Sequence, residues 1–368
     1  MDCLKENVFA YFLISLISLS AIPPVEAQSA NAIIIKGDGS VLGTDKIHHV
    51  GNLYSLTDSV TNVPIVVECN NIILDGGGFT LQGASWWGTP AAINLTCTNT
   101  TVQNFIIKSW EVGILGAYNN NTITNNAIES CERALAIYAD YYVVTANSIS
   151  NTAFGVRILN ANSNLFVGNT LRHNGYGFSA TNSWDNSVVA NNIENNNVAF
   201  SLDATTFQVY HNNFIDQNRD FEGGWYTHLL TLGNSSLLPS WDDGYPSGGN
   251  YYNDYKSRYP NASEIDTSGI GNIPYVINFN PNVTDNYPLI EPTKVSATTL
   301  PSPSSTSSPT NPSPTVSISL TPTGSSSSTP SPSVPEFSSW IILPLALITV
   351  LLAVLVGNRS KRKILTHC

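Results

Sequence analysis

The chain has 368 residues, a formal net charge of −11 and only 11% charged residues, about half the share of a typical soluble protein. Residues 28–339 carry 10 basic and 23 acidic side chains, so a nucleic-acid phosphate backbone would repel this part of the chain. The composition therefore argues against nucleic-acid binding, and it leaves uncharged polar residues, above all asparagine, to supply the polar surface.

Residues 1–27 are typical of a secretory signal peptide. An apolar run over residues 8–22 follows Lys5, and the segment Val25-Glu26-Ala27 fits cleavage after a small residue. The alternative is an uncleaved N-terminal anchor. We expect residues 28–65, which follow the signal peptide, to form the N-terminal cap of the next domain.

Residues 66–220 contain a repeat of about 22 residues, which decides the predicted fold. An asparagine recurs at intervals of 21 or 22 residues, at Asn104, Asn126, Asn147, Asn169, Asn191 and Asn212. An apolar residue follows each of these asparagines two positions later, and a small residue opens a second apolar patch eight or nine positions later. These short apolar segments are broken by Asn and Gly, which favours strands and turns over helices. We therefore predict an all-β fold, a parallel β-helix in which each repeat is one rung and the six asparagines form a ladder.

The cysteines bear on the same alignment. Aligning Asn71 with Asn99 places Cys69 and Cys97 at equivalent positions of adjacent rungs. Outside the cell, this arrangement favours either a disulfide or a buried pair of thiols. Cys131 has no partner at an equivalent position, so we expect it to be a buried apolar residue.

Several asparagines begin N-x-Ser/Thr sequons and are therefore candidates for glycosylation. The candidates are Asn94, Asn120, Asn234, Asn261 and Asn282. Asn99 also begins a sequon, but the alignment gives it a buried position in the rung, so we expect it to be unmodified.

The chain beyond the repeat falls into four segments. Residues 221–292 are rich in Gly, Tyr, Asn and Pro and are expected to cap the last rung. Residues 293–337 are rich in Ser, Thr and Pro, which predicts a semi-extended stalk. Residues 338–357 are apolar enough for one transmembrane helix, and the basic residues 358–368 predict a cytoplasmic tail. We therefore expect a single-pass membrane protein at the cell surface, with its N-terminal domain outside the cell.

The order of these segments carries a resemblance to a known family. Residues 32–41, 72–81, 211–216 and 241–251, together with the N-x-I-x-x-N-x-I rungs, resemble NosD-type, carbohydrate-binding/sugar-hydrolase-like proteins. The resemblance spans residues 31–290 and implies a right-handed parallel β-helix on an archaeal cell surface.

A second resemblance concerns the anchor. The segment Val334-Pro335-Glu336-Phe337, which precedes the apolar run, resembles a PEF-CTERM sorting signal. It implies an archaeosortase as a processing partner.

The resemblance bears on metal binding as well. Where the family has an acidic, Gly-rich loop that could hold Ca²⁺, this chain retains Asp266 as the one carboxylate, which argues against calcium there. Asp242 and Asp243 are further calcium candidates, although we favour a turn role for them before Gly244. Copper, which the NosD name implies, needs soft or imidazole ligands, and the histidines are scattered. We therefore expect no cofactor, with Ca²⁺ as the alternative.

The functional prediction follows from the side chains near the turns. Catalysis on a β-helix needs grouped carboxylates, and the alignment brings no two of them into one column. Aromatic rings and amides suit sugar rings, so we predict binding of carbohydrate or of a cell-envelope polymer, with an envelope glycan or a surface-layer protein as partner. The candidate ligand-binding residues are Trp110, Tyr138, Tyr142, Arg157, Tyr176 and Trp184. The alternatives are a purely structural or adhesive solenoid, a polysaccharide lyase or hydrolase, and a NosD-like copper-related protein.

Overall fold

A computed structural model describes residues 32–217, 221–223, 239–279 and 282–295. All of these lie in the first of two units, residues 1–306. The predicted signal peptide, the transmembrane segment, the basic tail and nearly all of the stalk lie outside the described residues. Within the described ranges, no helix is both long enough and apolar enough to cross a membrane.

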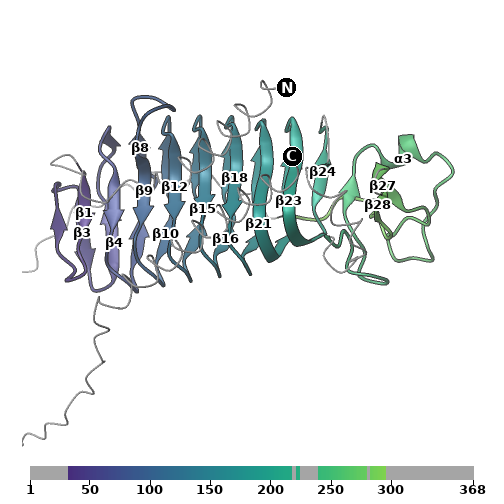
Figure 1. Ribbon diagram of the computed structural model, residues 1–368, viewed down its shortest axis with the longest axis horizontal. Coiled ribbons are helices and arrows are strands. Elements are labelled where there is room, and N and C mark those ends of the chain that lie inside the picture. Colours follow the sequence, from purple (N-terminus) through teal and green to yellow (C-terminus); the bar gives the residue numbers. More distant parts are fainter. Residues whose placement is uncertain (1–31, 218–220, 224–238, 280–281, 296–368) are drawn as a thin grey trace, which may run out of the picture. The chain divides into compact units, whose positions relative to one another are not determined.

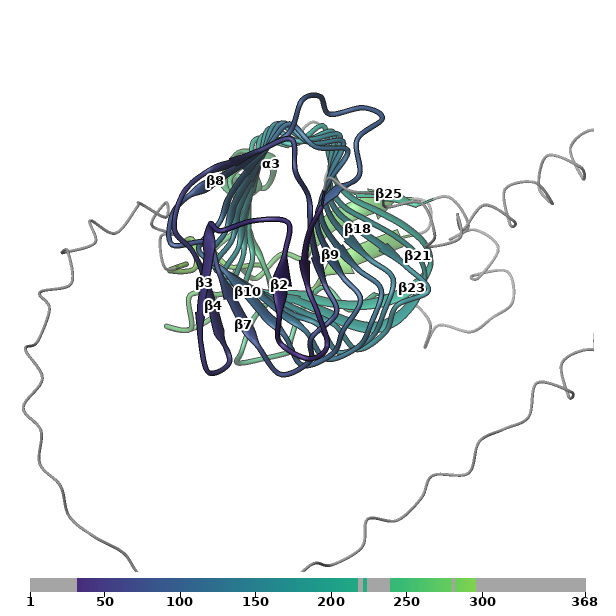
Figure 2. The same ribbon diagram turned by 90° about the vertical axis from the view of Figure 1, so that its left-hand side faces the viewer.

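The described chain is a right-handed parallel β-helix of about seven turns with about 22 residues per turn, which confirms the predicted fold class. Figure 1 shows the rungs stacked side by side, and Figure 2 shows them along the stacking direction. A typical rung has three short strands, such as β10 (Thr101–Gln103), β11 (Ile106–Lys108) and β12 (Val112–Gly116). Each strand pairs in parallel with its counterparts on the rungs before and after it. We call the three faces built from these strands sides 1, 2 and 3.

The strands divide among the sides by their pairing. Side 1 contains β4 (Leu53–Leu56), β7 (Ile73–Asp75), β10, β13 (Thr122–Thr124), β16 (Val143–Thr145) and β19 (Leu165–Val167). Side 2 contains β5 (Val60–Thr61), β8 (Thr80–Gln82), β11, β14 (Ala127–Glu129), β17 (Ser148–Ser150), β20 (Thr170–Arg172), β22 (Asn192–Glu194), β24 (Asn213–Ile215) and β26 (Tyr251–Tyr252). Side 3 contains β1 (Ile33–Ile35), β6 (Ile65–Val67), β9 (Ala91–Leu95), β12, β15 (Arg133–Ile137), β18 (Phe154–Leu159) and β25 (Phe221–Gly223). The long strands β21 (Tyr176–Val189) and β23 (Val198–Tyr210) begin on side 3 and continue onto side 1.

Antiparallel elements lie at both ends of the stack. At the first rungs, β2 (Val41–Leu42) pairs with β1, and β3 (Ile47–Val50) pairs with β4. After the last rung come a short helix, α3 (Tyr255–Arg258), and the hairpin of β27 (Tyr275–Phe279) with β28 (Asn282–Asp285). Antiparallel hairpins at these positions limit further parallel pairing at the open ends of the stack.

Columns of like side chains form the core. On side 3, the inward column is Ile114, Leu135, Val156, Phe178 and Phe200, all buried. The rings of Phe178 and Phe200 stack with centroids 4.9 Å apart, close to the spacing of neighbouring strands. Each fully buried side chain of this size stabilises the fold by about 2 kcal/mol. The stacking therefore turns the repeated apolar positions into one continuous core.

The small residue of the repeat has a steric reason. Gly113 lies just before the inward column, and a Cβ added to it would lie 2.5 Å from the carbonyl oxygen of Ala134 on the next rung. A Cβ on Gly155 would likewise lie 2.7 Å from the carbonyl oxygen of Gly177. Neighbouring rungs approach so closely at these two glycines that a Cβ would require them to separate.

An asparagine ladder runs along the corner between sides 1 and 2, as predicted for all but its first member. Asn126, Asn147, Asn169, Asn191 and Asn212 are each at most 1% exposed. The Oδ1 of each accepts a hydrogen bond from the backbone N–H of the residue at the ladder position of the preceding rung. The N···O distances are 2.8–3.0 Å. The ladder then continues to a member that the repeat did not predict, because the backbone N–H of Asn212 donates to Oδ1 of Asn250, 38 residues further on.

Asn104 is not part of this ladder, and the predicted alignment is wrong there by one residue. The pairing of β10 with β13 places Asn104 opposite Asn125, and Phe105 occupies the ladder position. Asn104 instead has a left-handed backbone (φ 59°), and its Nδ2 donates to Asp75 at 3.0 Å. This rung is one residue shorter than the spacing between Asn104 and Asn126 suggested.

Two further ladders, outside the six predicted asparagines, occupy the other corners. Between sides 3 and 1, the backbone N–H of Asn164 donates to Oδ1 of Asn186 at 3.0 Å. Between sides 2 and 3, the backbone N–H of Asn174 donates to Oδ1 of Asn196, and the backbone N–H of Asn196 donates to Oε1 of Gln217. Buried amides therefore satisfy backbone groups at all three corners, where strand pairing is interrupted.

Candidate functional site

Two of the predicted ligand-binding residues are buried, so the prediction that they form an exposed binding surface is wrong. Trp110 is 1% exposed and its Nε1–H donates to the backbone oxygen of Leu81 at 3.1 Å. Tyr142 is fully buried, and its hydroxyl accepts a hydrogen bond from Nδ2 of Asn121 at 3.0 Å. Both lie at corner positions where other rungs place a ladder residue, and these positions point inward.

Three other predicted residues lie on the outer surface of side 3. Tyr138 follows β15, Arg157 lies on β18 and Tyr176 begins β21, and all three are half-buried. The sixth candidate, Trp184, is 41% exposed and lies on β21 beyond this surface, where the strand turns the corner towards side 1. The structure thus brings Tyr138, Arg157 and Tyr176 onto one face and separates Trp184 from them.

An aromatic stack lies at the centre of this face. Phe154 and Tyr176 are paired in register on β18 and β21, and their rings stack with centroids 5.1 Å apart at an interplanar angle of 8°. The guanidinium carbon of Arg157 lies 5.2 Å from the Phe154 centroid, within reach of a cation–π interaction. We call Phe154, Arg157 and Tyr176 the aromatic cluster. Sequence reasoning did not select Phe154, although it shares a repeat position with Tyr176.

A charge network adjoins the aromatic cluster on the rung before it. Nη2 of Arg133 lies 2.8 Å from Oε1 of Glu111 and 3.2 Å from Oε2 of Glu132. Burial disfavours the charge of Arg133, but hydrogen bonds and charge attraction from Glu132 and Tyr138 outweigh it and raise the pKa of the guanidinium. These ion pairs hold the Arg133 side chain in place at the position next to Phe154.

The next rungs add polar groups to the same face. Ser179 and Ser201 continue the column of Arg157, and Thr181 and Asp203 form the neighbouring column. Oδ1 of Asp203 is buried with no hydrogen-bond partner in the structure, and burial raises the pKa of this carboxyl. Side 3 thus combines aromatic rings, a guanidinium, hydroxyls and a carboxyl on one outer surface.

The loop that precedes β9 also bears on this face. The indole side chains of Trp86 and Trp87 are 53% and 68% exposed, and their rings form an edge-on pair with centroids 6.2 Å apart. The sequence showed these residues as an insertion between two rungs, but gave no reason to assign them a role.

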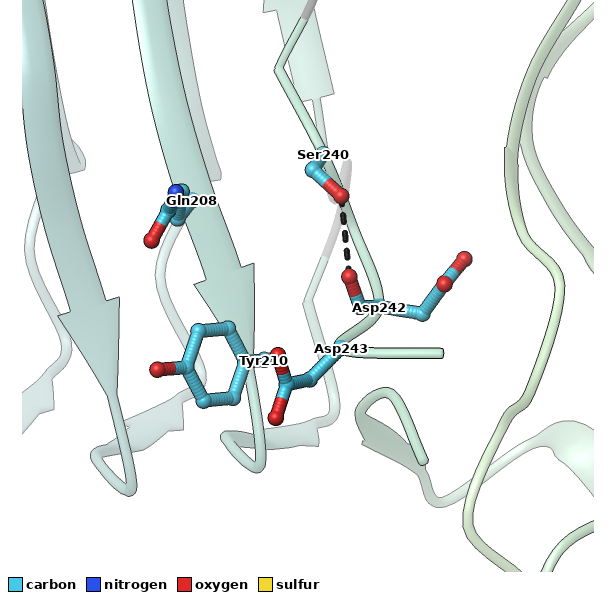
Figure 3. A pocket seen from close by; sticks show the side chains of 5 residues that line it. All are labelled: Gln208, Tyr210, Ser240, Asp242 and Asp243. Carbon is cyan, nitrogen blue, oxygen red and sulfur yellow. Dashed lines mark hydrogen bonds between the residues drawn. The ribbon is translucent and has the colours of Figure 1, made fainter. Parts of the chain in front are cut away.

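The predicted calcium residues lie elsewhere, near the last rung. Figure 3 shows a pocket of about 150 Å³ between Gln208 and Tyr210 of β23 and the segment that carries Ser240, Asp242 and Asp243. Oδ1 of Asp242 accepts the N–H of Gly244 at 3.1 Å, which supports the turn role.

The carboxylates around this pocket are occupied by hydrogen bonds. Oδ2 of Asp242 accepts two N–H groups of Asn286, and Asp243 accepts the Ser247 hydroxyl. Asp266 accepts the hydroxyl of Tyr245. Among the described residues, no group of three or more His, Cys, Asp or Glu side chains could hold a metal ion. The arrangement is that of a hydrogen-bonded loop cluster.

The cysteines stack as predicted. The pairing of β6 with β9 brings Cys69 and Cys97 to equivalent positions of adjacent rungs, and both are free thiols, so the structure does not contain the disulfide alternative. Cys131 is buried, as expected, and burial raises the pKa of its thiol to about 11.

The sequons differ in accessibility. Asn99 is exposed with a left-handed backbone (φ 56°), so the buried position predicted for it is wrong for the same one-residue reason as at Asn104. Asn120 and Asn261 are exposed, and Asn94 is half-buried on β9. Asn282 begins β28, and Asn234 lies outside the described residues.

One comparison with known proteins, the match to a family model, agrees with this fold. Residues 91–235 match the family model described as a right handed beta helix region. Two solved structures of DFA-IIIase from Arthrobacter chlorophenolicus A6 are similar, one a mutant in complex with DFA-III and one in complex with GF2. They share 9% and 10% sequence identity with this chain over 44% and 54% of its length, each with a TM-score of 0.35. The chain spans about half of their length, 53% and 56%. The comparison with curated proteins found no match.

Proposed function

We propose that this protein binds carbohydrate through the outer surface of side 3. The observation that carries the proposal is the aromatic cluster, in which Phe154 and Tyr176 stack at 5.1 Å and Arg157 lies over the Phe154 ring. Aromatic side chains suit the apolar C–H faces of sugar rings, and guanidinium and hydroxyl groups suit their oxygens. The hydroxyls of Ser179 and Ser201 lie in the Arg157 column and add such groups.

Tyr176 is half-buried and lies between the strands β18 and β23. Phe154 stacks on one face of the ring, and the register partner on the opposite side is Val198, a smaller and buried side chain. Among the described residues, Arg157 forms no ion pair, so its charge is available to a ligand oxygen. A purely structural solenoid, the alternative, does not require a partly exposed guanidinium beside a stacked aromatic pair.

We further propose that the protein presents this surface at the cell exterior, anchored through its C-terminal apolar segment. The support is the sequence, in which an N-terminal signal pattern, a Ser/Thr/Pro-rich stalk and an apolar run with basic residues behind it follow in order. The resemblance to NosD-type and PEF-CTERM proteins favours an archaeal envelope, an archaeosortase as processing partner, and an envelope glycan or a surface-layer protein as binding partner. Membrane fractionation before and after protease treatment of intact cells tests this placement.

Affinity electrophoresis of the full chain tests the binding proposal. We expect migration to slow in gels that contain at least one of polygalacturonate, alginate, xylan, hydroxyethylcellulose or glycol chitin. Tyr176→Ala should then weaken binding about tenfold or more, the loss typical of a buried aromatic anchor. Tyr118→Ala is the matched control, because Tyr118 is an exposed tyrosine beyond the end of β12, outside the aromatic cluster. Unaltered migration of the wild-type chain in all five gels would refute the proposal.

A further inference from the structure

The loop of residues 83–90, which joins β8 to β9, differs from every equivalent connection described. It has eight residues, whereas the next five connections from side 2 to side 3 have three each, at 109–111, 130–132, 151–153, 173–175 and 195–197. In Figure 2 this dark-blue segment projects beyond the outline of the stacked rungs. The core does not require the insertion, because the later rungs close without one.

The loop presents two indoles on a hydrogen-bonded frame. Trp86 and Trp87 are both more than half exposed and contact each other edge-on. The hydroxyl of Thr89 donates to the backbone oxygen of Ser85 at 2.9 Å, and the N–H of Trp87 donates to Oγ of Ser85 at 3.2 Å. Exposed indoles held in a fixed loop are typical of a binding surface, since tryptophan is enriched among the residues that dominate binding energy.

Glu111 connects this loop to the face of side 3. The N–H of Gly88 donates to Oε2 of Glu111 at 3.1 Å, and the N–H of Glu111 donates to the hydroxyl of Thr89 at 2.8 Å. The other carboxylate oxygen of Glu111 pairs with Arg133 at 2.8 Å. The loop is therefore braced against the charge network that adjoins the aromatic cluster.

The loop and the aromatic cluster lie along the same edge of side 3. Ala91 of β9 is followed at equivalent positions of successive rungs by Val112, Arg133, Phe154 and Tyr176. From the rung of the loop to that of Tyr176 there are four strand steps of about 4.8 Å, a span of about 19 Å. A ligand that contacts both ends of this line must be an extended chain of several sugars.

We propose that the Trp86–Trp87 loop is the outer contact for an extended polysaccharide that runs along this edge to the aromatic cluster. The inference rests on the proposed carbohydrate binding and names its ligand class, a polymer instead of a mono- or disaccharide. A membrane surface is the less suitable occupant, because the loop sequence GASWWGTP carries no basic residue and the chain has a net charge of −11.

The experiment measures binding by the full chain to the polysaccharide that retards it and to oligosaccharides of graded length from that polymer. We expect the double variant Trp86→Ala/Trp87→Ala to lose about tenfold in affinity for the polymer and the long oligosaccharides. Its affinity for disaccharides should match that of the wild type, whereas Tyr176→Ala should weaken binding at every length. Trp184→Ala is the matched control, since Trp184 is an exposed tryptophan away from this edge. Urea unfolding of each variant verifies that it folds.

The outcomes separate the two proposals. If Tyr176→Ala weakens polymer binding and the double variant binds the polymer like the wild type, the loop assignment is wrong and the proposed function stands. If the wild type binds none of the five polysaccharides, both fall. If the double variant instead loses binding to phosphatidylcholine vesicles that the wild type binds, the loop contacts membrane and the inference is overturned.

Discussion

Asn126 and Asn147 are joined by two hydrogen bonds that share one acceptor. The backbone N–H and the side-chain Nδ2 of Asn126 both donate to Oδ1 of Asn147, at 2.9 and 3.0 Å. Nδ2 of Asn147 in turn donates to the backbone oxygens of Ile123 and Thr145. A single buried amide thus satisfies groups on its own rung and on the rung before it.

Asn147→Ala should therefore destabilise the β-helix strongly. The substitution leaves the N–H of Asn126 without its acceptor and removes one donor from each of two carbonyl oxygens in a buried corner. An unsatisfied buried group costs about 1–3 kcal/mol. We expect the free energy of unfolding, measured with urea, to fall by about 2–4 kcal/mol. The exposed Asn52 is the control position, and Asn52→Ala should change stability by less than about 1 kcal/mol. Equal losses at both positions would contradict the ladder.

Gly113→Ala tests the close approach of neighbouring rungs. Its Cβ would lie 2.5 Å from the oxygen of Ala134 and 2.8 Å from Cγ2 of Ile128, so the rungs must separate to admit it. Overpacking of this kind typically costs about 1–3 kcal/mol, which thermal unfolding would detect as a lower Tm. At Gly37 the nearest atom to a new Cβ is 3.7 Å away, so Gly37→Ala should be tolerated. An unchanged Tm for Gly113→Ala would show that the rungs at Gly113 are further apart than described.

Asp285 should make stability depend on pH. Its carboxyl group is buried, and burial raises its pKa to about 8. The nearby charge of Asp242 also raises this pKa, whereas hydrogen bonds from the N–H groups of Asn250 and Tyr287 lower it. The folded state therefore binds more protons than the unfolded state between about pH 4 and pH 8. The contribution of Asp285 to stability is fully present below that window and is lost as the pH rises through it.

Urea unfolding of the wild type and of Asp285→Asn at several pH values checks this sign. The unfolding free energy of the wild type minus that of Asp285→Asn should decrease as the pH rises from 5 to 8, by at most about 1.4 kcal/mol per pH unit. Above about pH 8 the difference should level off. An increase of this difference over the same pH range would mean that the folded state holds Asp285 ionised.

The three thiols of the described residues should differ in their reactivity towards iodoacetamide. Cys69 is half-buried, whereas Cys97 and Cys131 are buried and burial raises the pKa of both thiols. Because the thiolate is the reactive form, we expect peptide mapping of the folded chain to find label on Cys69 and little on the other two. Labelling after unfolding is the control, and all three should then react. A peptide pair linked through Cys69 and Cys97 would instead establish the disulfide.

The repeat predicted the fold because a β-helix requires the same residue types at a fixed spacing along the chain. Asn126 to Asn212 recur where a buried amide must bridge two rungs, because the asparagine amide offers both a donor and an acceptor close to the backbone. The spacing failed at Asn104 because asparagine serves two purposes at this corner. It tolerates the left-handed turn position as well as filling the buried ladder position next to it, and the sequence shows the same letter for both.

The candidate site was predictable only in part. Tyr138, Arg157 and Tyr176 fall at outward positions, but Trp110 and Tyr142 fill inward corner positions where other rungs place polar residues. Whether an aromatic ring faces the core or solvent there depends on which side chains the neighbouring rungs supply. The bracing of the Trp86–Trp87 loop by Glu111 was also beyond prediction, because the loop is an insertion to which the repeat assigns no position.

The sequence by itself determined that this chain stacks rungs, since periodic apolar and amide positions can be buried only by repetition of the same turn. The tertiary structure alone decided where the chain carries its outer features. Lateral register places Phe154, Arg157 and Tyr176 on one face and aligns the tryptophan loop with them along one edge. Register is set by contacts between strands about 21 or 22 residues apart, and a shift of a single residue, as at Asn104, exchanges an inward position for an outward one.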